Sequence, residues 1–425
     1  MKAVRTYIPP TLDEQNYVQH ILERQFRNVV TKIPSGWDSR QNFDRTLMQL
    51  DKKSSPGWPL CREKPTIGEW LFGPGLFPIK TQSDKLWSMV NSVFEGDYTH
   101  IYKVFAKAEP HSFKKIEEKR WRLIMMSSLP VQVAWHMLLG HLAERLLPPY
   151  KTPLAHGLVY FGGGWKLFRH YIKQHRMNWT ADKSGWDWNS PWWVYEVTKC
   201  LLVALSDTED IDPAVLAKWL RVLNILFKDA FSDKKVILPD STILQQLIGG
   251  LMPSGCVWTI QINGIAQLAL HILALKRMRY PRITRLLATG DDTIQEMPPD
   301  LDAREYVKHL QQAGCVVKES GEGSDFMGFE ILWSGFYPKY FEKHLENLKI
   351  QKPEFLQETI EGYLRIYCYD EELYSFWRRI AQRLDFPMPS RTYFLYFAEH
   401  PDALEEFTFA RPSFGDRQVS KDVVV

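Results

Sequence analysis

The chain has 425 residues, 45% of them hydrophobic and 24% charged, a composition that is typical of globular proteins and argues against disorder. Its five cysteines are scattered without a CxxC pair, which argues against a disulfide framework or a zinc cluster and favours a reducing compartment. The net charge of +3 is too small to indicate nucleic-acid binding by itself, so the placement of the charges matters more than their sum.

The first part of the chain is predicted to contain helices separated by turn-rich loops. The first fifty residues have the pattern of mixed helix and loop, and turn signals crowd residues 54–75. A buried helix is predicted at 129–147, ending before two prolines. The loop at 156–168 contains three consecutive glycines without the GK[ST] ending of a phosphate-binding loop, so we expect a flexible connection there.

The rest of the chain mixes strands and helices without regular alternation. Ser190 is expected to cap a helix that has Pro191 at its first position. The predicted strands are 177–182, 235–239, 283–289, 293–297, 315–320 and 326–332. The predicted helices are 190–205, 213–230, 256–277 and 301–313, with residues 336–425 mostly helical.

Membrane insertion is not expected. The best candidate span, 259–276, is interrupted by four polar residues, and the N-terminus lacks the apolar stretch of a signal peptide. Positive charge instead concentrates at residues 101–122, which carry seven Lys or Arg against three Glu. A second basic cluster at 375–384 has a helical pattern, and a solvated face is its ordinary interpretation.

Acidic residues stand at two predicted turns. In LLATGDDTIQ, Asp291 and Asp292 lie between two apolar runs, although a lone GDD is usually only a turn. In ADKSGWDW, Asp182 ends a predicted strand and Asp187 follows a glycine turn, and a simple capping role for Asp182 is the alternative. If these carboxylates lie together, their repulsion requires cations. Oxygen ligands without His or Cys point to Mg²⁺, and two such ions suit an in-line displacement at phosphorus.

The stretch MPSGCVWTIQIN places polar groups at a predicted helix start. Thr259 and Asn263 are four residues apart and therefore share a helix face. Ser254 and Gly255 precede the helix, where backbone N–H groups are free. Near a metal site these groups could contact a ribose hydroxyl, and the alternative is ordinary hydrogen bonding inside a packed helix.

These motifs, in this order, resemble motifs A, B and C of viral RNA-dependent RNA polymerases: D-x4-D, then SG-x3-T-x3-N, then GDD. KAEPHSFKKIEEKRWRLI at 107–124 is similar to the basic finger motif of sobemovirus and polerovirus polymerases, K-x-E-P-H followed by R-x-R-L-I. SSPGWPL at 54–60 resembles their S/T-x-x-G-x-P motif, and SGWDW fits the same group. The resemblance covers about residues 50–335.

The resemblance implies a mixed α+β, right-hand fold with fingers, a palm whose antiparallel sheet is flanked by helices, and a short helical thumb. It assigns residues 1–178 to the fingers and fingertips, 179–335 to the palm with 206–245 as an inserted fingers segment, and 336–425 to the thumb. The implied reaction is attack of an RNA 3′-hydroxyl on the α-phosphate of an incoming NTP, which replicates a positive-strand RNA genome.

The resemblance also implies roles for single residues. Asp182 and Asp291, assisted by Asp292, would hold two Mg²⁺ ions, for which Mn²⁺ can substitute. Lys318 is the nearest candidate for the general acid toward pyrophosphate, and a solvated strand lysine is the alternative. The residues expected at the nucleotide are Lys107, Arg120, Arg122, Asp187, Ser254, Gly255, Thr259 and Asn263. The residues expected along the RNA are Ser54, Gly57, Arg378, Arg379 and Arg383.

Three other functions compete with this interpretation. A reverse transcriptase usually carries an aromatic and another residue before the paired aspartates, where this chain has Thr289 and Gly290, and it lacks the SG-x3-T-x3-N helix. A silent RNA-binding protein has no need of three mutually repelling carboxylates. A nucleotide cyclase would not explain the finger motifs or the length.

The expected partners follow from the polymerase resemblance. They are an RNA template and product duplex and NTPs, with a genome-linked protein and other viral replication proteins as further candidates. The implied location is the host cytoplasm, at membrane-associated replication sites. De novo and protein-primed initiation both stay open.

Overall fold

The computed structural model describes residues 7–107, 109–111 and 113–402. The strands are β1 (Thr31–Lys32), β2 (Tyr102–Ala106), β3 (Leu123–Met126), β4 (Met177–Lys183), β5 (Ser206–Asp207), β6 (Lys235–Ile237), β7 (Ile243–Gln245), β8 (Leu286–Thr289), β9 (Asp292–Glu296), β10 (Val317–Glu322), β11 (Asp325–Phe326), β12 (Phe329–Ile331) and β13 (Phe336–Pro338). The α-helices are α1 (Leu12–Phe26), α2 (Arg40–Met48), α3 (Lys80–Glu95), α4 (Phe113–Glu117), α5 (Leu129–Leu146), α6 (Gly164–Gln174), α7 (Trp186–Asn189), α8 (Trp192–Leu205), α9 (Pro213–Phe231), α10 (Thr259–Arg277), α11 (Ala303–Gln312), α12 (Phe341–Ile350), α13 (Leu356–Ile366), α14 (Glu371–Arg383) and α15 (Arg391–Glu399). The short helical turns are η1 (Arg27–Val29), η2 (Leu60–Arg62), η3 (Gly68–Phe72) and η4 (Pro353–Phe355).

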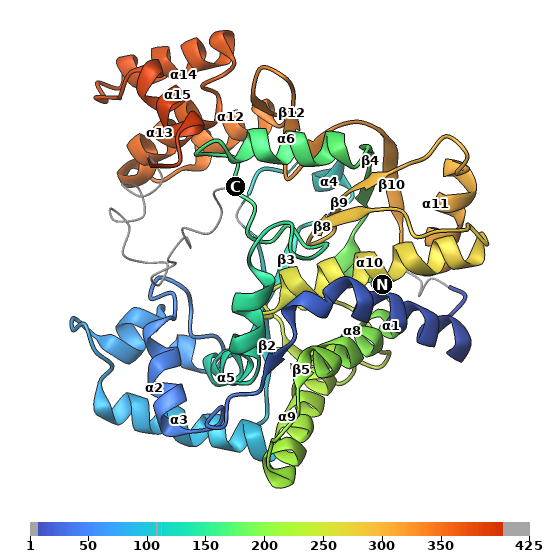
Figure 1. Cartoon of the computed structure of the whole chain (residues 1–425). Coiled ribbons are helices and arrows are strands. Elements are labelled where there is room, and N and C mark those ends of the chain that lie inside the picture. The colour runs from blue at the N-terminus through green and yellow to red at the C-terminus, as the bar shows by residue number, and fades with distance from the viewer. Residues whose placement is uncertain (1–6, 108, 112, 403–425) are drawn as a thin grey trace.

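The central sheet has the strand order β10-β4-β9-β8 and is antiparallel throughout. Along β4 the side chains of Trp179 and Ala181 are buried and that of Asp182 is exposed, the alternation of a strand with one face on the core. Beneath the sheet, α10 contacts β8, α8, α1 and α11 (Figure 1). Its residues from Gln261 to Leu275 are all buried, so its sequence lacks a polar stripe.

The N-terminal sheet has the order β3-β2-β6-β7 and joins two distant parts of the sequence. Strand β2 pairs antiparallel with β3 and parallel with β6. Strand β6 in turn pairs with β7. The segment 235–245 is therefore part of the same layer as residues 102–126, although more than a hundred residues separate them in the chain.

The C-terminal bundle, which we define as α12 to α15, lies at the upper left of Figure 1, across from α2 and α3. It has its own hydrophobic core, in which Tyr367, Trp377 and Phe394 are fully buried. The same core includes Trp165 and Phe168 of α6 and Phe336 of β13. The bundle is thus anchored to the central sheet through α6, which contacts β4, and through the β11-β12-β13 sheet, whose strand β11 contacts β9.

Most predicted elements are confirmed within a few residues, among them the hairpin at 283–297 and the helices at 129–147 and 256–277. The expected cap at Ser190 is wrong, because α8 begins only at Trp192 and Pro191 occupies the N-cap position. The Ser190 hydroxyl instead accepts a hydrogen bond from the Tyr195 hydroxyl at 2.5 Å. That contact uses the side chain that a cap would require.

The glycine-rich loop is not a free connection. The backbone N–H groups of Gly162 and Gly163 donate to the carbonyls of Phe397 and Ala398 at 3.1 and 2.8 Å. Gly163 has φ +80° and leads directly into α6, a conformation that glycine adopts without strain. The loop therefore fastens α6 to α15. Over the described ranges, no helix is both long enough and apolar enough to cross a bilayer.

Candidate active site

The β8–β9 hairpin places the paired aspartates at its tip. The register runs from Leu286↔Gln295 to Thr289↔Asp292, which leaves Gly290 and Asp291 as the turn. Gly290 has φ +62°, a value that few other residues adopt readily. The sequence therefore fixes both the turn and the direction in which Asp291 leaves the sheet.

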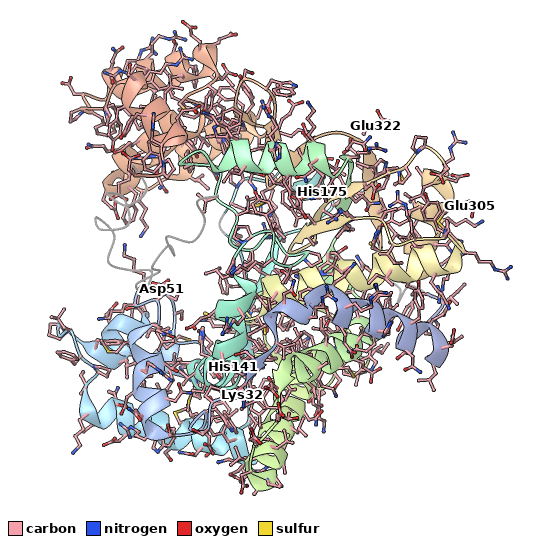
Figure 2. The ribbon with its side chains drawn as sticks, viewed as in Figure 1. Lys32, Asp51, His141, His175, Glu305 and Glu322 are labelled. Carbon is pink, nitrogen blue, oxygen red and sulfur yellow. The ribbon has the colours of Figure 1, made fainter. Side chains whose placement is uncertain are left out.

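We define the acidic centre as Asp182, Asp291 and Asp292. Strand β4 lies beside β9 with Ala181 opposite Thr293, so Asp182 at the end of β4 adjoins the hairpin. The centre lies toward the Val317 end of β10, opposite the end marked by Glu322 in Figure 2. Burial raises the pKa of Asp291 and of Asp292, and the neighbouring carboxylates add to this effect. Like charges at this turn are therefore only partly compensated by the protein.

Two of the three carboxylates already have partners. Asp182 Oδ2 accepts a hydrogen bond from Lys318 Nζ at 2.7 Å, and Asp292 Oδ2 accepts one from the Met327 backbone N–H at 2.6 Å. Among the residues that the structure describes, no three His, Cys, Asp or Glu side chains are grouped as a metal site. The chemistry of the donors still fits a hard divalent cation, because they are carboxylate oxygens whose charge the surroundings leave partly uncompensated.

Asp187 lies on α7, directly after the acidic strand. Burial and then the charge of Asp291 raise the pKa of Asp187 to about 6, while Arg122 and Lys234 act in the opposite direction. In the same turn, Trp186 Nε1 donates to Asn263 Oδ1 at 2.7 Å. The predicted residues of the first acidic motif and of α10 are thus brought together, and the amide of Asn263 is held by a buried indole. Sequence reasoning did not assign a role to Trp186.

The loop before α10 is bound to β3. Ser254 Oγ accepts a hydrogen bond from the Met125 N–H at 3.1 Å, and the Gly255 N–H donates to the Met125 carbonyl at 3.0 Å. A Cβ atom on Gly255 would lie 2.4 Å from that carbonyl oxygen, so only glycine fits. The Thr259 hydroxyl donates back to the Cys256 carbonyl at 2.6 Å. These contacts hold the start of α10 against the strand that follows the basic segment.

We define the basic loop as residues 107–122. Three of its cations are paired with acids of the same loop: Glu109 lies 3.2 Å from Lys107 and 3.7 Å from Arg122, and Arg120 lies 2.6 Å from Glu118. Lys343 of α12 reaches Glu109 at 3.9 Å. Burial acts to raise the pKa of Glu109, but its cationic neighbours outweigh burial and lower it.

Arg122 also acts on the acidic side of the site. Its charge lowers the pKa of both Asp187 and Asp291, which places the basic loop within electrostatic reach of the acidic centre. Glu109 and Lys343 were not identified from the sequence as site residues. The K-x-E-P-H motif contained the signal for Glu109, whereas nothing local connects Lys343 to it.

The residues predicted along the RNA lie in three other places. The Ser54 hydroxyl donates to Asp51 Oδ2 at 2.6 Å. Gly57 has φ +70°, and a Cβ atom there would lie 2.2 Å from the Ser127 carbonyl oxygen. On α14, Arg378 donates to the carbonyls of Met388 and Pro389 at 3.0 and 3.2 Å. Arg379 and Arg383 have exposed side chains. Gly57 and Arg378 therefore have structural duties whatever else they contact.

Comparison with known proteins decides the family. A family model described as viral RNA-dependent RNA polymerase matches residues 8–323. The chain belongs to this family. Membership of this family also accounts for the order in the sequence of the basic motif at 107–124, the D-x4-D motif, the SG-x3-T-x3-N motif and the GDD turn.

Individual relatives agree with the family match. The chain is 23% identical to protein P1-P2 of potato leafroll virus, across 72% of this chain and 30% of that protein. It is 24% identical to an RNA-directed RNA polymerase of mushroom bacilliform virus, across 62% of this chain and 63% of that protein. It is 23% identical to the replicase polyprotein P2AB of Southern cowpea mosaic virus, across 64% of this chain and 30% of that protein. The chain thus spans less than two thirds of the length of these relatives, and they confirm the sobemovirus and polerovirus resemblance.

The polymerase fold is confirmed by a solved structure. The sicinivirus 3Dpol RNA-dependent RNA polymerase superposes with a TM-score of 0.73, covering 92% of this chain and 86% of that chain at 15% identity. The mixed α+β, right-hand architecture expected from the motifs is therefore present.

Proposed function

We propose that the chain catalyses template-directed transfer of a nucleotidyl group from an NTP to an RNA 3′-hydroxyl, and so replicates a positive-strand RNA genome. One observation carries the proposal. The chain belongs to the viral RNA-dependent RNA polymerase family, and its site residues are linked to one another. Strand pairing brings Asp182 to the hairpin of Asp291 and Asp292. Beside Asp187, Trp186 is hydrogen-bonded to Asn263, and the charge of Arg122 acts on Asp187.

The proposed domains follow the expected boundaries: fingers and fingertips at 1–178, palm at 179–335 with 206–245 inserted as fingers, and thumb at 336–425. Pairing of β6 with β2 supports the assignment of the inserted segment to the fingers. The separate core of the C-terminal bundle supports the thumb. Two elements before residue 179 pack on the palm instead, since α1 contacts α8 and α10, and α6 contacts β4.

Family membership implies dependence on divalent cations in general. We propose that Asp182 and Asp291, assisted by Asp292, bind two Mg²⁺ ions, with Mn²⁺ as a substitute. The bound ions would activate the 3′-hydroxyl and stabilise the leaving pyrophosphate. To hold an ion, Asp182 would give up its contact with Lys318. Lys318 would then be free to act as the proton donor toward pyrophosphate.

The nucleotide is proposed to lie between the basic loop and α10. Lys107, Arg120 and Arg122 would contact the triphosphate, because the three cationic side chains are themselves exposed to solvent and can exchange a carboxylate for phosphate oxygens. Trp186 occupies Oδ1 of Asn263, so the amide offers its N–H groups to the ribose 2′-hydroxyl. Asp187 can accept the hydrogen of the same hydroxyl. Ser254, Gly255 and Thr259 hold the loop that places Asn263.

Contacts with RNA are proposed along two surfaces. Ser54 and Gly57 would line the template path, and the exposed Arg379 and Arg383 of α14 would contact phosphates of the product duplex. Arg378 belongs to the same set of proposed RNA contacts. Its hydrogen bonds to two carbonyls also hold the loop between α14 and α15 in place. Because backbone phosphates dominate such contacts, affinity should fall with salt.

Proposed partners are the RNA template and product, NTPs, and other viral replication proteins, with a genome-linked protein among the candidates. Two relatives carry the names P1-P2 and replicase polyprotein P2AB, which supports partners from the same virus. The proposed place of action is the host cytoplasm, at membrane-associated replication sites.

The test is incorporation of labelled NTPs on a single-stranded RNA template with Mg²⁺, comparing wild type with Asp291→Ala. Wild type should incorporate NTPs and use dNTPs poorly, and the variant should lose roughly a hundredfold or more of the activity. Asp44→Ala, which changes an exposed aspartate of α2, is the matched control and should stay active. RNA binding without incorporation by wild type, even from an annealed primer with Mn²⁺, would favour a silent RNA-binding protein.

A further inference from the structure

Lys183 is a buried lysine directly behind the acidic centre. It follows Asp182 on β4, but its side chain faces the core with only 7% exposed. Its ammonium donates to the Ala181 carbonyl at 3.0 Å and to the Thr293 hydroxyl. Since Thr293 follows Asp292 on β9, the ammonium is held between the two strands that carry the three carboxylates.

Burial of a lysine in this core costs free energy unless nearby negative charges stabilise its ammonium group. Trp179 and Ala181, on the same face of β4, are apolar and buried, and an apolar residue would complete that face without the desolvation cost of an ammonium. Burial lowers the pKa of Lys183 on balance, and Cys315 together with Asp291, Asp292 and Asp182 acts in the opposite direction. The lysine and the acidic centre therefore stabilise each other's charged forms.

The two lysines near the acidic centre differ in their freedom. Lys318 approaches Asp182 from the solvent side with 61% of its side chain exposed, so an arriving cation can displace it. Lys183 is buried in the core and is hydrogen-bonded to β4 and β9. It is therefore held beside the acidic centre whether or not a metal ion is bound.

We propose that Lys183 is a buried countercharge of the acidic centre, which stabilises the palm before a divalent cation arrives and raises the cation concentration needed to fill the site. The inference rests on the metal role of Asp182 and Asp291 proposed above. In this proposal the charge of Lys183 weakens the affinity of the acidic centre for the cation, while Lys183 itself neither coordinates the cation nor transfers a proton.

The test measures Mn²⁺ binding by the electron paramagnetic resonance of free Mn²⁺, together with thermal melting in EDTA and in Mn²⁺. Lys183→Met removes the charge, and Lys183→Gln removes the charge but keeps a hydrogen-bond donor in case the first variant folds poorly. Both should bind Mn²⁺ about tenfold more tightly, the order expected when a nearby like charge is removed from a partly screened site. Their melting temperatures should fall in EDTA and recover with Mn²⁺ by more than that of wild type.

Three controls separate the outcomes. Lys234→Met removes another buried lysine, which donates to the Leu251 carbonyl at 2.8 Å, and should lower melting equally with and without Mn²⁺. Thr293→Val removes an acceptor but keeps the charge, and should leave Mn²⁺ affinity near wild type. If both Lys183 variants bind Mn²⁺ no more tightly than wild type while Asp291→Asn loses binding, the countercharge is overturned and the metal site stands. If Asp291→Asn binds like wild type, the metal site itself is wrong and the countercharge falls with it.

Discussion

The acidic centre and the basic loop hold their charges in opposite ways. Burial raises the pKa values of the Asp291 and Asp292 carboxylates, and the charge of Lys183 and, for Asp291, that of Arg122 offset this only in part. In the basic loop, Lys107 and Arg122 pair with the largely buried Glu109, and Arg120 pairs with the more exposed Glu118. The difference teaches that the carboxylates of the acidic centre keep much of their charge uncompensated, whereas these three cations of the basic loop each have a carboxylate partner.

The pH dependence of stability tests the acidic side of this comparison. Asp187 has a pKa raised to about 6, so the unfolded chain ionises first as pH rises, and the fold loses stability between about pH 4 and 6. Above that range the loss is complete. Asp187→Asn should therefore be more stable than wild type by up to about 3 kcal/mol at pH 7.5, and by about half as much at pH 5.

Denaturant unfolding at the two pH values measures this difference. Asp44→Asn, at an exposed aspartate that pairs with Arg40, is the control and should show no gain at pH 7.5. An Asp187→Asn gain that is the same at both pH values would mean that ionisation of Asp187 is not its cause.

Removal of one cation of the basic loop should mainly affect nucleotide binding. Arg122→Ala is expected to raise the KM for NTPs about tenfold with a smaller change in kcat, since a charge-assisted contact to phosphate is lost. Steady-state incorporation at varied NTP concentration gives both constants. Arg45→Ala, at an exposed arginine of α2, should change neither, and a fall confined to kcat would argue against the proposed triphosphate contact.

The buried indole at the boundary of the two regions should affect sugar selection. Trp186→Phe keeps the ring but removes the donor to Asn263 Oδ1, so the amide is free to turn and the NTP to dNTP preference should fall severalfold, with a stability loss of about 1–3 kcal/mol for the unsatisfied acceptor. Competition between an NTP and its dNTP measures the preference. A stability loss with an unchanged preference would make Trp186 a packing residue only.

The smallest effect is expected when the basic loop loses its own acid. Glu109→Gln leaves Lys107 and Arg122 without their carboxylate, but solvent screens both cations, and screened ion pairs contribute about 0–1 kcal/mol. The KM for NTPs should therefore change by about twofold or less. A loss as large as that of Arg122→Ala would show that Glu109 shapes the loop and does more than balance its charge.

The parts of the site that the sequence predicts are those set by neighbours in the chain. The glycine turn of Asp291 and Asp292 and the strand end at Asp182 are local, and the alternation of Met177, Trp179, Ala181 and Lys183 on the buried face of β4 was visible in the sequence. That alternation places Lys183 inward, although its charge made an exposed position the ordinary expectation.

The parts that were missed depend on partners far away in the chain. Lys343 lies more than two hundred residues from Glu109, and Ser190 lost its capping role to a contact with Tyr195 that only the packed helix creates. Strands β2 and β3 flank the basic loop and were not predicted, because the many charged residues around them obscure the apolar alternation of a strand. Tertiary contacts decided each of these cases, and residue types in a short window do not specify them.

Strand β3 has one further consequence. It leaves the basic loop at Leu123, and at Met125 it is hydrogen-bonded to Ser254 and Gly255 before α10. A few residues of backbone therefore join the basic loop, which we propose contacts phosphate, to the start of α10, which we propose contacts the sugar, although the two are far apart in the sequence. A substitution in this strand that suits one task must be tolerated by the other, so the two ends constrain each other's evolution and cannot drift as separate modules.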